Sequence, residues 1–109
     1  MKDKNIYLNN ILDKANEAID FCKGIPRKEF LKDNKTQSAV ILKLIIIGEE
    51  AKKLSEKVRS EVDLPWKMII SLRNIAIHEY FDVDLVEIYK TVRNDLPELI
   101  NKIEKYLKN

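Results

Sequence analysis

The feature that most constrains this chain is the spacing of its apolar residues, which recur every three or four positions over most of the sequence. This period places side chains on one face of an α-helix, whereas a half-buried strand needs alternation at every second residue. Only 2 Gly and 3 Pro interrupt the 109 residues, of which 45% are hydrophobic and 35% charged. The pattern therefore predicts an all-α fold, and the length suits a single domain, residues 1–109.

Two helical segments are predicted in the first half of the chain. The first is expected to stop at Gly24, with Pro26 in the usual position beyond the stop, and a basic connector over residues 25–35 follows. The second runs from Val40 to Val58 and has a second apolar row, so we expect it to be central or to meet another subunit. The apolar positions are Leu8, Ile11, Ala15, Ile19 and Cys22 in the first segment, and Val40, Leu44, Ile47, Ala51, Leu54 and Val58, with Ile41, Leu42, Ile45 and Ile46 beside them, in the second.

Two further helical segments are predicted in the second half. The third opens at Pro65, a favourable first helical position. The fourth begins at Asp84, and Glu87 three residues later completes a capping-box pattern. Pro97 lies inside the apolar period of this last segment, so we expect a kink there or a restart of the helix capped by Asp95.

The remaining composition excludes several classes of protein. The longest nearly apolar run, residues 39–47, is interrupted by Lys43 and is too short to span a bilayer, and no apolar signal region follows the first five residues. We therefore expect a soluble, cytoplasmic protein with no membrane partner. Cys22 has no second cysteine to pair with and falls on an apolar stripe, so a buried structural thiol is expected. A formal net charge of +2 permits an anionic partner without requiring one.

Residues 71–80, SLRNIAIHEY, hold the one histidine of the chain, His78, together with Arg73 and Tyr80. On a regular helix Arg73 and Tyr80 lie within about 20° of each other, on a row of large apolar side chains. A permanent charge on such a face must pair with a carboxylate or line a cleft or a subunit interface. His78 falls about 140° from Arg73 on an ideal helix, so the two converge within one subunit only if the helix ends or distorts near Ile77.

Arg73 and His78, without further ligands at suitable spacing, are compatible with only a few kinds of catalysis. One His and one distant Cys do not form a metal site, and Ser71 lacks the surroundings of a serine nucleophile. An imidazole that moves protons near neutral pH and a guanidinium that neutralises a phosphate suit cleavage of an RNA phosphodiester, whose ribose 2′-hydroxyl is the nucleophile. Such cleavage works best with two proton-transfer groups, and a symmetric dimer supplies the second imidazole.

The spacing of Arg73, His78 and Tyr80 resembles the R-x4-H-x-Y signature of HEPN-domain proteins of the HepT type. The resemblance extends over most of the chain, through IIIGEEAKKL (residues 45–54), LPWKMIISLRN (64–74), HEYFDVDL (78–85) and DLPELI (95–100). It implies an antiparallel bundle of four to five helices that dimerises, with the motifs of both subunits facing a shared cleft.

The same resemblance implies a function: a metal-independent ribonuclease toxin that needs no cofactor and acts on RNA. The partner it implies is a minimal nucleotidyltransferase antitoxin that transfers AMP to the motif tyrosine. It assigns catalysis to Arg73 and His78, substrate positioning to Asn74 and AMP acceptance to Tyr80. Either Glu49 or Glu50 is expected to pair with Arg73.

Two other interpretations stay open at this point. The helical dimer is alternatively a non-catalytic, substrate-binding or regulatory subunit of the nucleotidyltransferase, in which Arg73 and His78 contact a nucleotide phosphate. In a purely structural interpretation Arg73 is a salt-bridged packing residue, His78 belongs to a helix end, and Tyr80 is a core residue with its hydroxyl at the surface.

Overall fold

The computed structural model of the chain describes residues 4–76 and 83–108, so the predictions for Ile77, His78 and Tyr80 fall outside the described residues. Within these two ranges every regular element is helical and no strand occurs. The predicted all-α class is therefore confirmed. No helix within these ranges has the length and apolar character needed to cross a membrane.

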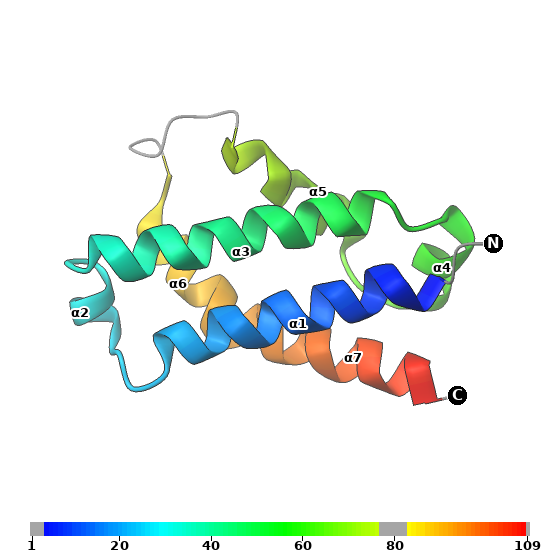
Figure 1. Ribbon diagram of the computed structural model, residues 1–109, viewed down its shortest axis with the longest axis horizontal. Coiled ribbons are helices and arrows are strands. Elements are labelled where there is room, and N and C mark those ends of the chain that lie inside the picture. Colours follow the sequence, from blue (N-terminus) through cyan, green and yellow to red (C-terminus); the bar gives the residue numbers. More distant parts are fainter. Residues whose placement is uncertain (1–3, 77–82, 109) are drawn as a thin grey trace.

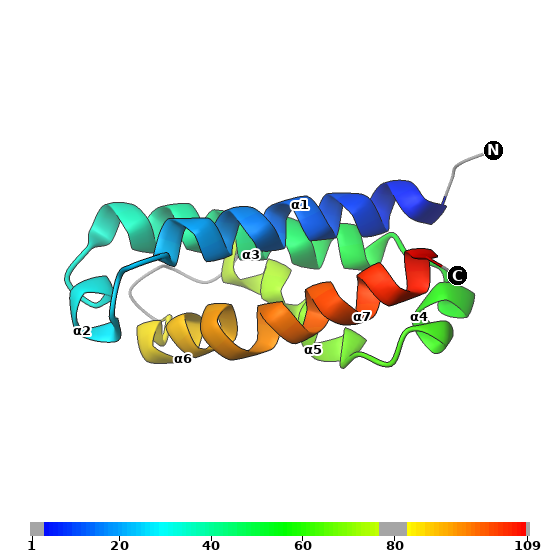
Figure 2. The ribbon, with the colours of Figure 1, turned by 90° about the horizontal axis from the view of Figure 1, so that it is seen from below.

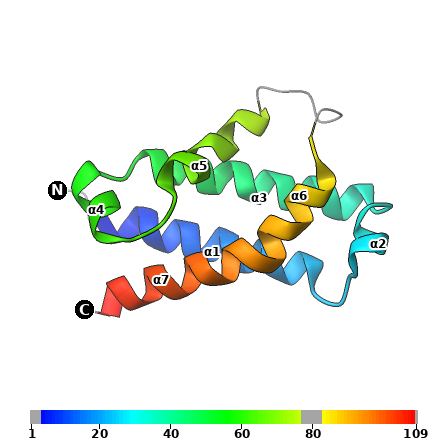
Figure 3. The ribbon, with the colours of Figure 1, turned by 180° about the vertical axis from the view of Figure 1, so that it is seen from behind.

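Three long helical rods form the body of the molecule (Figures 1 and 2). Two of them, α1 and α3, lie side by side and antiparallel, and the third rod, α6 through α7, packs against α1 from below. A shorter unit, α5 with η1, lies on the other side of α3 and runs antiparallel to it (Figure 3). The elements are α1 (Lys4–Cys22), α2 (Arg27–Phe30), α3 (Asn34–Lys52), α4 (Glu56–Glu61), α5 (Trp66–Ser71), the 3-10 helix η1 (Leu72–Ala76), α6 (Leu85–Lys90), the π-helical turn η3 (Thr91–Asp95) and α7 (Leu96–Lys108).

The core lies where these rods meet. Its fully buried side chains come from all three, and they include Leu8, Ile11, Leu44, Ile47, Leu96 and Ile103. Cys22 is buried at the end of α1, as expected for a structural thiol, and burial raises the pKa of this thiol although Arg93 opposes the shift. At the predicted stop, Gly24 adopts a φ of 76°, which a glycine tolerates without steric cost.

The basic connector between α1 and α3 contains a short helix and a buried aromatic side chain. It contains α2, whose Phe30 is fully buried and stacks on Tyr89 with ring centroids 5.2 Å apart. The buried Gln37 side chain donates to the Phe30 carbonyl at 2.8 Å. The Ile25 carbonyl accepts from the Tyr89 hydroxyl at 2.7 Å and from Arg93 Nη2 at 3.1 Å. The connector is thus fixed both to α3 and to the α6–η3 rod.

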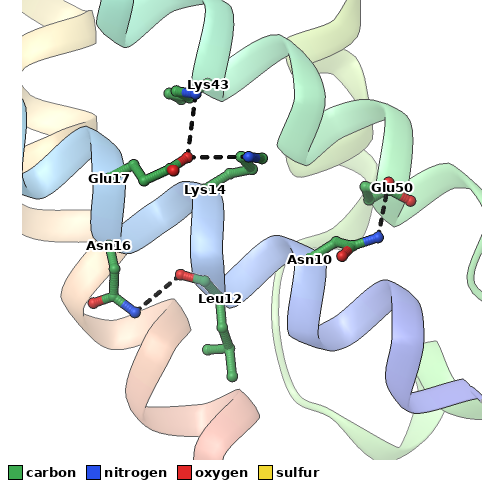
Figure 4. Close-up of polar contacts among 7 residues, drawn as sticks. All are labelled: Asn10, Leu12, Lys14, Asn16, Glu17, Lys43 and Glu50. Atoms are coloured by element: carbon green, nitrogen blue, oxygen red, sulfur yellow. Dashed lines mark hydrogen bonds and ion pairs between the residues drawn. The ribbon is translucent and has the colours of Figure 1, made fainter.

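Polar contacts also join α1 to α3 (Figure 4). Glu17 of α1 pairs with Lys14 at 3.1 Å and reaches across to Lys43 at 3.2 Å. Hydrogen bonds from Lys14 and then Lys43 lower the pKa of the Glu17 carboxyl. About two turns further toward the start of α1, the Asn10 amide donates to Glu50 at 3.2 Å. These two contacts restrict sliding of the helices along each other.

The second predicted helix does not run unbroken to Val58. α3 ends at Lys52, and α4 starts at Glu56. Its cap is Ser55, whose hydroxyl accepts from the Val58 amide at 3.2 Å. A serine hydroxyl that bonds to the backbone competes with helix continuation, which explains the break. Leu54 and Val58 are buried, so the apolar period correctly marked core positions across two separate helices.

The fourth predicted helix begins where expected, because Asp84 caps α6 by accepting from the amides of Val86 and Glu87 at 3.1 and 3.2 Å. The distortion expected at Pro97 is a π-helical turn, in which the Leu96 amide bonds to the Thr91 carbonyl five residues back. Pro97 has no amide hydrogen for the Arg93 carbonyl, so the backbone shifts its bonding just before the proline. The alternative of a restart capped by Asp95 is wrong, since Asp95 lies within the helical rod.

The Asp33 cap of α3 makes a pH-dependent contribution to stability. Its carboxylate accepts from the Thr36 hydroxyl at 2.6 Å and from the Thr36 amide at 3.0 Å, and these bonds, the hydroxyl first, lower its pKa. Asp33→Ala is expected to lower the urea midpoint at pH 7. Because a lowered carboxyl pKa stabilises the fold above the unfolded-state pKa, the difference between the variants should shrink as the pH falls through the folded-state pKa.

Urea titrations of both proteins from neutral to acidic pH measure this difference, with Asp13→Ala on the exposed face of α1 as the control. A difference that stays constant down to the lowest pH contradicts the role of the ionised cap.

Candidate functional site

The site is organised by a close crossing of two backbones. α5 and η1 pass over α3 at Gly48, which is buried near the C-terminal end of that helix, four residues before Lys52. A Cβ at position 48 would lie 2.6 Å from the backbone nitrogen of Arg73 and 3.1 Å from the carbonyl oxygens of Ile69 and Ile70. Real Cβ atoms do not approach backbone this closely, so the segment that carries Arg73 reaches its position only because residue 48 has no side chain.

The helix that carries Arg73 changes its winding before it reaches that residue. α5 ends at Ser71, and the Leu72 amide bonds to the Ile69 carbonyl three residues back, which begins η1. The angles of a regular α-helix therefore do not apply to residues 72–76. The distortion expected near Ile77 and the row shared with Tyr80 lie outside the described residues and stay predictions.

Arg73 has the carboxylate partner that its position requires. Its Nε lies 3.6 Å from Glu49 Oε1, and its side chain is 31% exposed against 50% for Glu49. This resolves the choice between the two adjacent glutamates in favour of Glu49. At 3.6 Å with a half-exposed carboxylate the pair is loose, so an anion of higher charge density can compete with Glu49 for the same guanidinium.

Glu50 serves a different purpose. It accepts from Asn10 of α1 and pairs with Lys53 at 3.4 Å, and its side chain is only 14% exposed. The two neighbouring carboxylates thus face different elements: Glu49 pairs with Arg73 of η1, whereas Glu50 faces Asn10 of α1 (Figure 4).

Asn74 lies beside a cavity of about 370 Å³ between η1 and the start of α6. The cavity combines polar side chains with an apolar wall. Its lining residues are Ser71, Asn74, Ile75, Val83, Asp84, Glu87 and Ile88.

Of the four residues singled out in the sequence, the structure thus describes two. Arg73 and Asn74 are adjacent on η1, with Arg73 against α3 and Asn74 at the cavity next to α6. His78 follows Ala76 by two residues in the sequence and, like Tyr80, is outside the described ranges, so its convergence with Arg73 stays a prediction. In residues 4–76 and 83–108 no group of three or more His, Cys, Asp or Glu side chains is placed to hold a metal ion.

Two features of the site were not deduced from the sequence. One is the role of Gly48, although an interior helical glycine costs about 1 kcal/mol relative to alanine and such a residue often marks a close backbone approach. The other is the place of Glu87 in the site. From the sequence it was interpreted only as part of the capping pattern of a helix, whereas it also lines the cavity.

Comparisons of the sequence with known proteins identify a family and several relatives. The sequence profile of the family "Ribonuclease HepT-like" matches residues 11–106. The chain is 39% identical over 103 residues to "Probable ribonuclease HepT" of Thermococcus cleftensis, covering 94% of each chain. It is 36% identical over 104 residues to "Putative RNase MJ1380" of Methanocaldococcus jannaschii, covering 94% of this chain and 95% of that protein.

Fold and site together define the class of this protein: an all-α helical bundle with an arginine–carboxylate pair on η1 and α3, next to a cavity with an apolar wall and a polar rim. Within that class, the chain belongs to the HepT-like ribonuclease family. No solved structure matches it.

The Gly48 contact yields a prediction for the site. In Gly48→Ala the added methyl group has to push η1 away from α3, because its nearest neighbours are backbone atoms that cannot rotate aside. Overpacking of this kind costs roughly 1–3 kcal/mol, which urea unfolding measures. Amide chemical shifts in residues 69–74 are expected to change most.

Ser38→Ala is the matched control, since Ser38 lies on the exposed side of the same helix. If both alanines have the same effect on stability, the substitutions act through helix propensity, and the close contact does not limit the position of η1.

Proposed function

We propose that this protein is a metal-independent RNA endonuclease, with Arg73 and His78 as its catalytic residues. The observation that carries the proposal is the placement of Arg73. The Arg73 side chain is 31% exposed, its backbone is held against α3 at the Gly48 crossing, and its carboxylate partner, Glu49, is loosely held. A guanidinium in this setting is prepared to accept a phosphate. Membership of a ribonuclease family and the relatives' names support RNA as the substrate.

In the proposed reaction the ribose 2′-hydroxyl attacks the adjacent phosphorus, and the 5′-oxygen of the next nucleotide leaves. A base removes the proton from the attacking hydroxyl, and an acid returns one to the leaving oxygen, so no net proton is consumed in this step. His78 performs one of these transfers, since an imidazole exists in both forms near neutral pH. Arg73 stabilises the negative charge that gathers on the phosphate oxygens.

A homodimer completes this mechanism, because the sequence contains one histidine and two proton transfers are needed. The exposed side of α3 supports such an assembly. Leu42 there is 51% exposed, Ile45 and Ile46 are half-buried, and Glu49 continues the same surface toward Arg73. Burial of these aliphatic side chains against a second copy favours association and brings the two sites toward each other.

The regulatory part of the proposal is that the protein is the toxin of a toxin–antitoxin pair. Its partner is a minimal nucleotidyltransferase that transfers AMP to the Tyr80 hydroxyl. Each AMP adds about one negative charge and considerable bulk seven residues after Arg73, where both oppose the binding of a substrate phosphate.

Catalysis is tested with RNA in EDTA, using protein expressed without the partner. Arg73→Ala and His78→Ala are each expected to lower the cleavage rate by roughly 10²–10⁴-fold, because each removes one catalytic contribution of that size. Lys67→Ala, which removes an exposed cation from α5, should keep the rate of the wild type.

Circular dichroism and size-exclusion chromatography establish that the variants remain folded and associated. If unmodified wild type cleaves nothing, the protein is better described as a nucleotide-binding or regulatory subunit of the nucleotidyltransferase. If Arg73→Ala or His78→Ala unfolds the chain, that residue is structural.

Modification is tested separately with the nucleotidyltransferase and ATP. Tyr80→Phe is expected to lose the mass increase of AMP, whereas Tyr106→Phe, on the far end of α7, should gain it as the wild type does. Intact-mass spectrometry reads both results. AMP found on the Tyr80→Phe protein assigns the acceptor to another residue.

A further inference from the structure

We propose that the cavity between η1 and α6 is a nucleobase subsite that prefers guanine and disfavours uracil. This inference rests on the proposed function insofar as the base belongs to an RNA substrate. Its geometric basis is the volume of about 370 Å³, lined from η1 and from the first turn of α6. Small-molecule sites span roughly 300–1,000 Å³, so the space is adequate for a base and part of its ribose.

The location links the cavity to Arg73. Arg73 and Asn74 are consecutive on a 3-10 helix, on which successive side chains point about 120° apart. Arg73 meets Glu49 of α3, while Asn74 lines the cavity on the side of α6. A nucleotide whose phosphate contacts the guanidinium therefore has a recess for its base at the neighbouring residue.

The walls of the cavity fit the face of a base. Ile75 and Val83 are half-buried and Ile88 is almost wholly buried, so aliphatic surface forms one side of the space. A planar heteroaromatic ring that leaves water for such a wall gains free energy through burial of its apolar face. RNA-binding proteins read single-stranded bases in this way, with the ring face packed and the Watson–Crick edge hydrogen-bonded.

Apart from the Asn74 amide, which both donates and accepts, the polar groups around the cavity are mainly acceptors. Asp84 and Glu87 contribute carboxylates, which accept hydrogen bonds when ionised. The Ser71 hydroxyl donates to the Met68 carbonyl at 2.6 Å and so presents its lone pairs outward. Guanine offers two adjacent donors, N1–H and the 2-amino group, to such surroundings. Uracil offers one N–H between two carbonyl oxygens, and these oxygens are repelled.

Glu87 is the carboxylate assigned to read the base. Asp84 Oδ1 is already bonded to the amides of Val86 and Glu87 as the cap of α6. The Glu87 side chain is 65% exposed, and its pair with Lys90 at 3.7 Å is a weak surface contact. A carboxylate in this situation can turn to accept both donors of one guanine.

The test measures binding of GMP, IMP and UMP to the unmodified protein by amide chemical-shift titration. IMP retains N1–H but lacks the 2-amino group, so it isolates one of the two hydrogen bonds. GMP is expected to bind roughly tenfold more tightly than IMP, and UMP more weakly still, because a hydrogen bond to a charged group is lost. Glu87→Gln should remove most of this preference.

Glu104→Gln is the matched control, since it removes the same charge from an exposed position of α7. The Glu87→Gln helix keeps its cap, which uses the Glu87 backbone and not its side chain. Equal affinities for the three nucleotides, no shifts with GMP at any concentration, or an unchanged preference in Glu87→Gln would each overturn the assignment.

Binding and cleavage measurements together distinguish a failure of the nucleobase subsite from a failure of the proposed endonuclease. A preference for GMP that depends on Glu87, in a protein that cleaves no RNA, leaves the subsite standing and removes the endonuclease. Cleavage of oligonucleotides at equal rates beside G and U removes the subsite and leaves the endonuclease.

Discussion

The position of the candidate site depends on one contact between backbones, that of η1 with α3 at Gly48. The missing side chain at this residue lets the Arg73 backbone approach α3 closely, and Glu49 is the next residue along that helix. A single sequence position therefore controls both the depth at which the arginine is fixed and the identity of its carboxylate. The long α1–α3 pair provides a rigid support for this contact, because its core is fully buried and polar contacts restrict sliding.

Much of the fold followed from the apolar period. The stop at Gly24, the start at Asp84 and the burial of Cys22 and Val58 were all predicted, because each depends on chemistry within a few residues. The break at Ser55 was not predicted, and at Pro97 a distortion was expected but its form, a π-helical turn, was not. Both arise where a side-chain cap or a missing amide competes with a continuing helix. The spacing of apolar residues alone does not show which of two local hydrogen-bonding patterns forms.

The site itself was predictable in part. The need for a carboxylate beside Arg73 follows from the cost of burying a charge, whereas the choice of Glu49 required knowing where η1 crosses α3. The change to a 3-10 helix at Leu72 means that angles taken from an ideal α-helix do not describe residues 72–76, which include Arg73 and Asn74. The cavity beside Asn74 brings together residues of two different elements, η1 and α6, and the apolar spacing within one helix does not reveal such a meeting.

The contacts that hold α6 in place do not depend on the covalent link between residues 76 and 83. Tyr89 and Arg93 hold the α6–η3 rod to the Ile25 carbonyl, and Phe30 stacks on Tyr89. These bonds, like the packing of α7 on α1, join residues 4–76 to residues 83–108 through space and use none of the covalent connection between them. These packing contacts therefore help to fix the distance between Arg73 and Glu87. Two fragments produced by a cut between residues 76 and 83 would keep every described contact through which they can associate.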